Sequence, residues 1–166
     1  MKILFPDPQR TTELHHQNMA HTPVLIREDG SYLKEANQYL RDRSIGHWIP
    51  RPHKSSPLNN EKFVEQSSIS KKAMAQRLIQ FLSWCERSGK DWREVNYEDL
   101  HNNWLSELMT GTLSSNSKPL TNATVNIFVS EAMNFLTWAA DLDLRAPFKV
   151  PPMALIRKRL KTFERF

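Results

Sequence analysis

Two long segments of the chain carry apolar side chains at helical spacing, and each begins with a cluster of polar side chains. They cover residues 70–92 and 121–148. Steps of three and four residues place the apolar members on one side of an α-helix. In the first segment these members are Met74, Leu78, Phe81, Leu82 and Cys85. In the second they are Val125, Phe128, Ala132, Phe135, Leu136 and Ala139. The pattern predicts two amphipathic helices, one starting near residues 68–70 and the other at Thr121.

A shorter helix is expected between these two, from about Tyr97 to Met109. Asn96 is a favourable N-cap for it, and acidic residues follow in its first turn, where the helix dipole favours negative charge. Its apolar stripe consists of Leu100, Trp104 and Leu108. The tryptophans of these stripes, Trp84, Trp104 and Trp138, are expected to pack in a core. Residues 111–119 are polar and are expected to form a loop.

The segment 22–45 predicts one more helix. Asp29-Gly30 is a turn signal, Ser31 is a candidate N-cap, and the helix is expected to run to about Arg43 and to end at Gly46. Residues 1–21 show no periodicity and are expected to form a poorly ordered arm, while residues 47–67 form a connector. No strand pattern is strong. The predicted class is therefore all-α, a small four-to-five-helix bundle with an extended N-terminal arm.

The composition sets limits on compartment and cofactors. No apolar run approaches the roughly 18 residues of a membrane span, and the N-terminus does not have the form of a secretory signal. Cys85 is the single cysteine, so a cytoplasmic location is expected and core packing is favoured over a reactive thiol. His15, His16 and His21 have no cysteine or carboxylate at ligand spacing, so a solvated segment is favoured and no metal or cofactor is expected.

The net charge of +5 is unevenly distributed. Residues 1–69 carry a net +1 and residues 70–148 a net −1, whereas residues 149–166 hold six basic residues and one acidic residue. Within this last segment Pro152 is positioned to open a helix, in which Ile156, Leu160 and Phe163 share one face. The helical core therefore has no overall charge bias, and any contact with a polyanion depends on local clusters and on the basic tail.

The polar starts of the two long helices are the candidate binding sites. A helix N-terminus presents free backbone N–H groups and the positive end of the dipole, which suits phosphate, while lysine adds charge and asparagine can bind adenine edges. The alternative is that Ser70 and Thr121 only cap their helices. The candidate DNA-binding residues are Ser70, Lys71, Lys72, Arg77, Lys118, Thr121, Asn122, Thr124, Asn126, Arg157, Lys158, Arg159 and Lys161.

The order of several residues resembles the SAM-like core-binding domain of tyrosine recombinases, the phage integrase family. The first part of the pattern is Ser70, Phe81, Trp84, Asp91-Trp92, Val95 and Asp99-Leu100. The second part is Thr121, Thr124-Val125-Asn126, Phe135, Trp138-Ala139 and Pro147-Phe148. Residues 29–40, DGSYLKEANQYL, are also similar to a segment that precedes this domain in several integrases.

The resemblance implies a DNA-binding module without its chemistry. In this family the core-binding domain and a catalytic domain clamp duplex DNA from opposite faces, recombinases act as oligomers on DNA, and a linker joins the two domains. The catalytic domain supplies a nucleophilic tyrosine with arginine, lysine and histidine or tryptophan partners. Here Tyr32, Tyr39 and Tyr97 fall in no matching motif, and no HxxR occurs. The chain alone is therefore not expected to cut DNA.

The expected organisation has three parts. Residues 1–65 are an arm with one short helix, residues 66–148 are the core-binding domain, and residues 149–166 are a basic interdomain linker. The expected partners are double-stranded DNA and a following catalytic domain, with no membrane. The alternative is a helical protein–protein adaptor, whose basic amphipathic C-terminal helix could dock on an acidic partner or a membrane surface.

Overall fold

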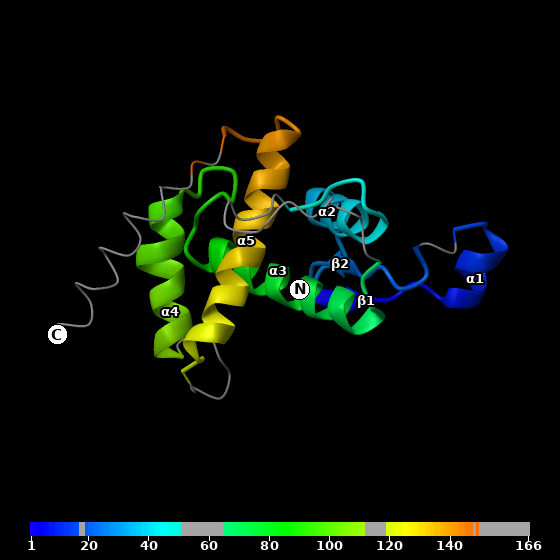
Figure 1. Cartoon of the computed structure of the whole chain (residues 1–166), viewed down its shortest axis with the longest axis horizontal. Coiled ribbons are helices and arrows are strands. Elements are labelled where there is room, and N and C mark those ends of the chain that lie inside the picture. The colour runs from blue at the N-terminus through cyan, green and yellow to red at the C-terminus, as the bar shows by residue number, and fades with distance from the viewer. Residues whose placement is uncertain (17–18, 51–64, 112–118, 148, 150–166) are drawn as a thin grey trace, which may run out of the picture.

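The computed structural model describes residues 1–16, 19–50, 65–111, 119–147 and 149. Helices dominate these ranges, which confirms the helical class (Figure 1). A two-stranded antiparallel sheet, for which the sequence has no strong strand pattern, joins the helices. The elements are β1 (Lys2–Leu4), α1 (Pro8–Glu13), β2 (Val24–Ile26), α2 (Lys34–Ile45), α3 (Ser68–Arg87), η2 (Asp99–Trp104), α4 (Leu105–Thr110) and α5 (Asn122–Asp141).

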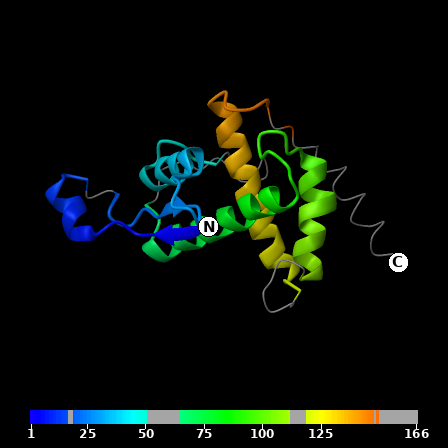
Figure 2. The same cartoon turned by 180° about the vertical axis from the view of Figure 1, so that it is seen from behind.

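The N-terminal segment is more structured than its lack of periodicity predicted. β1 pairs with β2 over three residues, and Ile3 lies opposite Leu25, which is fully buried against the helices. On the other edge of β2, the side chain of Asn37 occupies the backbone groups of Leu25: its Oδ1 accepts from the Leu25 N–H at 2.6 Å and its Nδ2 donates to the Leu25 carbonyl at 2.8 Å. Tyr32 forms an antiparallel bridge with Ile26 on the same edge. These contacts, distant in sequence, order the hairpin. α1 buries no side chain and stands away from the helical core (Figures 1 and 2).

Helix α2 belongs to the main core. Tyr39 and Leu40 are fully buried, and the helix packs against both α3 and α5. The predicted end at Gly46 is confirmed, with a left-handed φ of 76°. The predicted cap at Ser31 was wrong, because the helix begins at Lys34. One hydrophobic cluster therefore extends across the boundary expected at residues 65 and 66, and α2 shares the core of the later helices.

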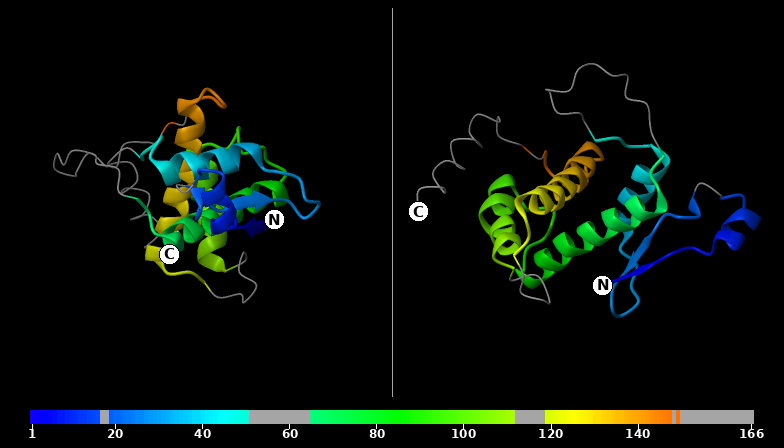
Figure 3. Two further views of the ribbon diagram at one scale, coloured as in Figure 1. Left: turned by 90° about the vertical axis from the view of Figure 1, so that its right-hand side faces the viewer. Right: turned by 60° about the horizontal axis from the view of Figure 1, so that its bottom comes forward.

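Helices α3 and α5 cross at the centre of the fold, as Figure 1 shows (Figure 3 gives two further views). Their predicted stripes are confirmed, since Phe81 and Trp84 of α3 and Phe135 and Trp138 of α5 are almost completely buried. Phe135 lies edge-on to Phe81 with the ring centroids 6.4 Å apart, and stacks on Trp138 at 5.8 Å. Cys85 also lies in this core, as predicted. Its burial, together with the charge of Asp91, raises the pKa of the thiol to about 12, so Cys85 stays protonated.

The helical turns that begin at Tyr97 confirm the third predicted helix, but six residues within it have π-helical hydrogen bonding. Asn96 is its cap: the Asp99 N–H donates to Asn96 Oδ1 at 2.9 Å, and the Asn96 N–H donates to Asp99 Oδ2 at 3.1 Å. This reciprocal pair satisfies two backbone donors at the helix start. Trp104 at the end of η2 is fully buried and meets Phe81 edge-on at 5.3 Å.

Candidate nucleic-acid interface

The N-terminus of α3 is capped by Ser67, one turn before the residue that the sequence singled out. The Ser70 N–H donates to Ser67 Oγ at 3.2 Å, and the Ser67 hydroxyl also lies 3.0 Å from Ser70 Oγ. Ser70 is therefore an exposed first-turn residue and not the cap. Lys72 is exposed beside it, so hydroxyl and ammonium groups lie together at a helix N-terminus, where an anion is stabilised.

Lys71 does not share this exposed position. Its residue is 1% exposed, and its Nζ lies 3.7 Å from Glu65 Oε1. The expectation that Lys71 faces DNA with Lys72 was wrong, because position 71 precedes Met74 by three residues and Leu78 by seven and so falls on the buried stripe. The long aliphatic stem lets a lysine occupy such a position. The exposed charge at this helix start is that of Lys72.

Arg77 is half-buried and acts on a buried acid between the helices. Glu131 of α5 accepts a hydrogen bond from the Tyr39 hydroxyl at 2.5 Å and lies 3.8 Å from Arg43 Nη1. Burial raises the pKa of Glu131 above its ordinary value, while the charge of Arg43, the Tyr39 hydrogen bond and the charge of Arg77 each oppose that rise. We call Tyr39, Arg43, Arg77 and Glu131 the Glu131 network. It joins α2, α3 and α5, and sequence analysis missed it.

The N-terminus of α5 has the same cap pattern as α3. Thr121 is the predicted N-cap, and its Oγ1 accepts from the Thr124 N–H at 3.3 Å and lies 2.9 Å from Thr124 Oγ1. The capping alternative is thus correct for Thr121, whose backbone and hydroxyl still face solvent. Asn122 and Asn126 are exposed and lie off the buried side of the helix, as their place in the sequence predicted. Their amide groups are free to meet a ligand.

The fold does not bring the two helix starts together. They lie on the same side of the molecule but apart along its long axis, with α3 beginning near the strands and α5 beginning near α4 (Figures 1 and 3). A ligand that touches both must therefore be extended. The other candidate residues, Lys118, Arg157, Lys158, Arg159 and Lys161, lie outside the described residues.

Acidic residues are unevenly distributed along the helical core, and they are missing from the segments that contain the starts of α3 and α5. Residues 66–85 contain three basic residues and no acidic residue, and residues 108–130 contain one basic residue and no acidic residue. Six acidic residues gather between them, in residues 86–107. The first halves of α3 and α5 are therefore free of carboxylates on their exposed faces, so neither repels a polyanion.

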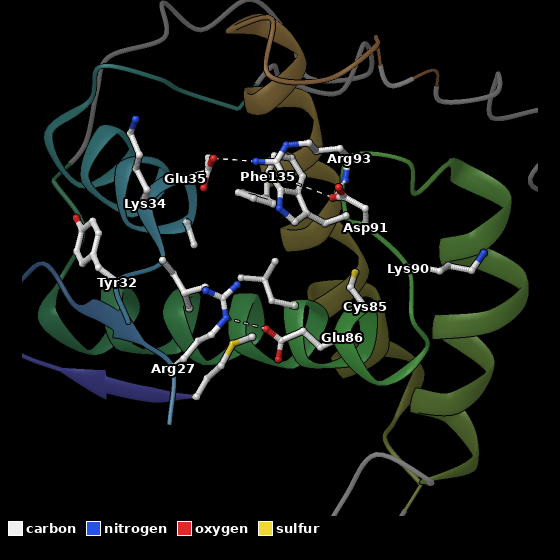
Figure 4. A pocket seen from close by; sticks show the side chains of 15 residues that line it. Arg27, Tyr32, Lys34, Glu35, Cys85, Glu86, Lys90, Asp91, Arg93 and Phe135 are labelled. Carbon is white, nitrogen blue, oxygen red and sulfur yellow. Dashed lines mark hydrogen bonds and ion pairs between the residues drawn. The ribbon is translucent and has the colours of Figure 1, made fainter. Parts of the chain in front are cut away.

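A cavity of about 390 Å³ lies elsewhere, between β2, the start of α2, the second half of α3 and the link after it (Figure 4). Its rim is closed by ion pairs: Arg93 Nη2 lies 2.8 Å from Glu35 Oε1, and Arg27 Nε lies 3.2 Å from Glu86 Oε1. The apolar part of its lining consists of Met1, Leu33, Ala36, Leu82, Cys85, Trp92 and Phe135. Since these cations are already paired with carboxylates, the cavity is a poor phosphate site.

A three-residue metal cluster and a membrane-spanning helix are both absent from the described ranges. Within them, no three His, Cys, Asp or Glu side chains come close enough to hold a metal ion, and His15, His16 and His21 are exposed. No helix in the same ranges combines the length and apolar character that a membrane crossing requires.

Comparisons of the chain with protein-family models, with curated proteins and with solved structures gave no match.

Proposed function

We propose that this chain binds duplex DNA as the core-binding domain of a tyrosine recombinase and that a catalytic domain in the same protein performs strand cleavage. The observation that carries the proposal is the shared side formed by the first halves of α3 and α5. Both helices begin there with a hydroxyl cap. Neither half exposes an acidic side chain, because Glu131, where the first half of α5 ends, is buried. Lys72, Asn122 and Asn126 are exposed on these halves.

The separation of the two helix starts favours a long polyanion over a small one. A nucleotide or a free phosphate would occupy one helix N-terminus only, whereas a duplex offers phosphates on both sides of a groove and can meet both. On this view Ser70 and Lys72 bind backbone phosphate and fix the position of the protein. The α5 start, which has hydroxyl and amide groups but no charge of its own, lies closer to the bases.

The test is the salt dependence of duplex binding by the full chain, measured by fluorescence anisotropy. Each phosphate contact contributes a slope of about one in log Kd against log salt, so Lys72→Ala should lower the slope by about one. Lys71→Ala should leave the slope unchanged and lower the melting temperature instead, because Lys71 is buried. Lys34→Ala, at an exposed lysine of α2, is the matched surface control.

Two outcomes would count against the proposal. Binding to duplex that is absent, or that does not weaken with salt, would exclude DNA as the ligand and favour the adaptor alternative. A slope that Lys72→Ala and Lys34→Ala reduce equally would show that binding is diffuse and that the α3 start is not its site.

A further inference from the structure

The cavity between β2, α2 and α3 has the size and the division of surfaces that a small-molecule site needs (Figure 4). Its volume of about 390 Å³ lies towards the lower end of the range of ligand pockets, which is roughly 300–1,000 Å³. Such pockets combine a mainly apolar lining with a few polar groups that fix the orientation of the ligand. Both parts are present here, as an apolar floor and a charged rim.

The floor of the cavity is partly aromatic and carries no charge. The rings of Trp92 and Phe135 have their centroids 4.9 Å apart, and Leu82 and Cys85 of α3 continue the surface beside them. The thiol of Cys85 stays protonated, so this side chain is neutral as well. An aromatic ring of a ligand would leave water for these surfaces and could meet the two rings edge-on.

The rim of the cavity carries charges of both signs in two ion pairs, Arg93 with Glu35 and Arg27 with Glu86 (Figure 4). The four side chains are between 31% and 51% exposed. Ion pairs with this much exposure contribute little to stability, because water competes for both partners. A ligand can therefore take the place of one partner at little cost. The Arg93 guanidinium also lies 4.4 Å from the centroid of the Trp92 ring, so the charged rim adjoins the aromatic floor.

This rim disfavours a ligand with a single charge. An anion that binds Arg93 in place of Glu35 leaves that carboxylate without its partner, and a cation that binds Glu35 leaves Arg93 with Asp91 alone, at 3.4 Å. A zwitterion avoids both losses. Its carboxylate meets the guanidinium while its ammonium meets the carboxylate, so each charge keeps an opposite charge beside it.

We propose that this cavity binds a free α-amino acid with an aromatic side chain. The side chain lies against Trp92 and Phe135, and the α-carboxylate and α-ammonium lie between Arg93 and Glu35. The inference goes beyond the proposed DNA binding and does not depend on it, because neither Lys72 nor Asn126 lines the cavity. The bound amino acid would contact α2, α5 and the link after α3 at once, so it should stabilise the folded chain.

The test compares three probes that share a phenyl ring. L-Phenylalanine carries both charges, phenylacetate only the carboxylate, and phenethylamine only the ammonium. Their Kd values for the full chain are measured by isothermal titration calorimetry. L-Phenylalanine should bind about tenfold more tightly than either of the others. At a concentration of about ten times its Kd, it should raise the melting temperature by roughly 3–6 °C.

Two rim variants should change the preference in opposite directions. Glu35→Gln removes the partner of the ammonium and frees Arg93, so it should weaken phenylalanine by about tenfold and strengthen phenylacetate. Arg93→Gln should weaken phenylalanine by a similar factor and strengthen phenethylamine. Arg87→Gln is the matched control, because Arg87 is 54% exposed, lies 3.0 Å from Glu107 and does not line the cavity. Its affinities should equal those of wild type.

Three results would overturn the inference. They are no binding of any probe, equal affinity for all three probes, and a loss of phenylalanine binding in Arg87→Gln as large as that in Glu35→Gln. None of them bears on DNA binding. Conversely, a chain that binds phenylalanine as expected but does not bind duplex DNA would refute the proposed function alone.

Discussion

Replacing Tyr39 by phenylalanine removes one oxygen atom from the Glu131 network and leaves the ring in place. The hydroxyl is completely buried, donates to Glu131 Oε1 at 2.5 Å and accepts from Arg43 Nη1 at 3.0 Å. A hydrogen bond to a charged group contributes about 1.5–3 kcal/mol, and here water cannot replace the lost donor because Glu131 is buried. We expect Tyr39→Phe to lower the free energy of unfolding by about 2–3 kcal/mol.

The measurement is urea unfolding followed by both far-UV circular dichroism and tryptophan fluorescence, whose agreement tests two-state behaviour. In a chain of this size the expected loss corresponds to a decrease in melting temperature of roughly 5–10 °C. Tyr32→Phe is the control, because Tyr32 is 57% exposed, and it should change stability by less than about 0.5 kcal/mol.

The pH dependence of this loss identifies its cause. The Tyr39 hydroxyl stabilises the ionised form of Glu131, so its removal should matter less once the carboxyl is protonated. The penalty of Tyr39→Phe should therefore shrink from neutral to mildly acidic solution. A penalty below about 0.5 kcal/mol, or one that is constant with pH, would refute the view that a buried carboxylate holds α2 on α5.

Two further predictions concern Glu131 and the contact between α2 and β2. Because burial raises the pKa of Glu131, the folded state binds a proton at this carboxyl more tightly than the unfolded chain does. The free energy of unfolding of wild type, relative to that of Glu131→Gln, should therefore rise as pH falls from the raised pKa towards 4.5. A difference that does not change with pH would contradict this. Asn37→Ala should cost about 1–3 kcal/mol and speed hydrogen exchange at the Leu25 amide, which loses its partner, whereas Gln38→Ala should leave that amide protected.

The long helices could be predicted because their signals are local. A stripe with a period near 3.6 and a hydroxyl three residues before a free N–H define α3 and α5 without any knowledge of the rest of the fold. The same local reasoning failed at Lys71, where residue type indicated exposure but position on the stripe required burial. The alternative role considered for Ser70, helix capping, belongs to Ser67, since both serines offer a hydroxyl at the same helix start.

The features that could not be predicted from the sequence depend on contacts between residues far apart in the chain. β1 and β2 are three residues each, too short for a periodic signal, and the paired residues lie 20 or more positions apart in the sequence. Glu131 falls on the core-facing side of α5, but no residue near it in the sequence indicates that Tyr39 and Arg43 are its partners. The position of the two helix starts on one side of the molecule likewise comes from how α3 and α5 cross.

The bond between Asn37 and Leu25 also affects how this protein meets other chains. A strand with free N–H and C=O groups is a template for pairing with a strand of a second molecule, which is the first step of domain swapping and of fibre growth. The amide of Asn37 occupies the groups of Leu25 that such a strand would use. In the described part of the sheet only the outer edge of β1 is left, and its three residues include the exposed Lys2. The inner edge of β2 is thus covered by the Asn37 side chain together with the backbone of residues 31–33, where the Leu33 N–H donates to the Leu25 carbonyl at 3.4 Å and the Ser31 carbonyl accepts from the Arg27 N–H at 2.9 Å.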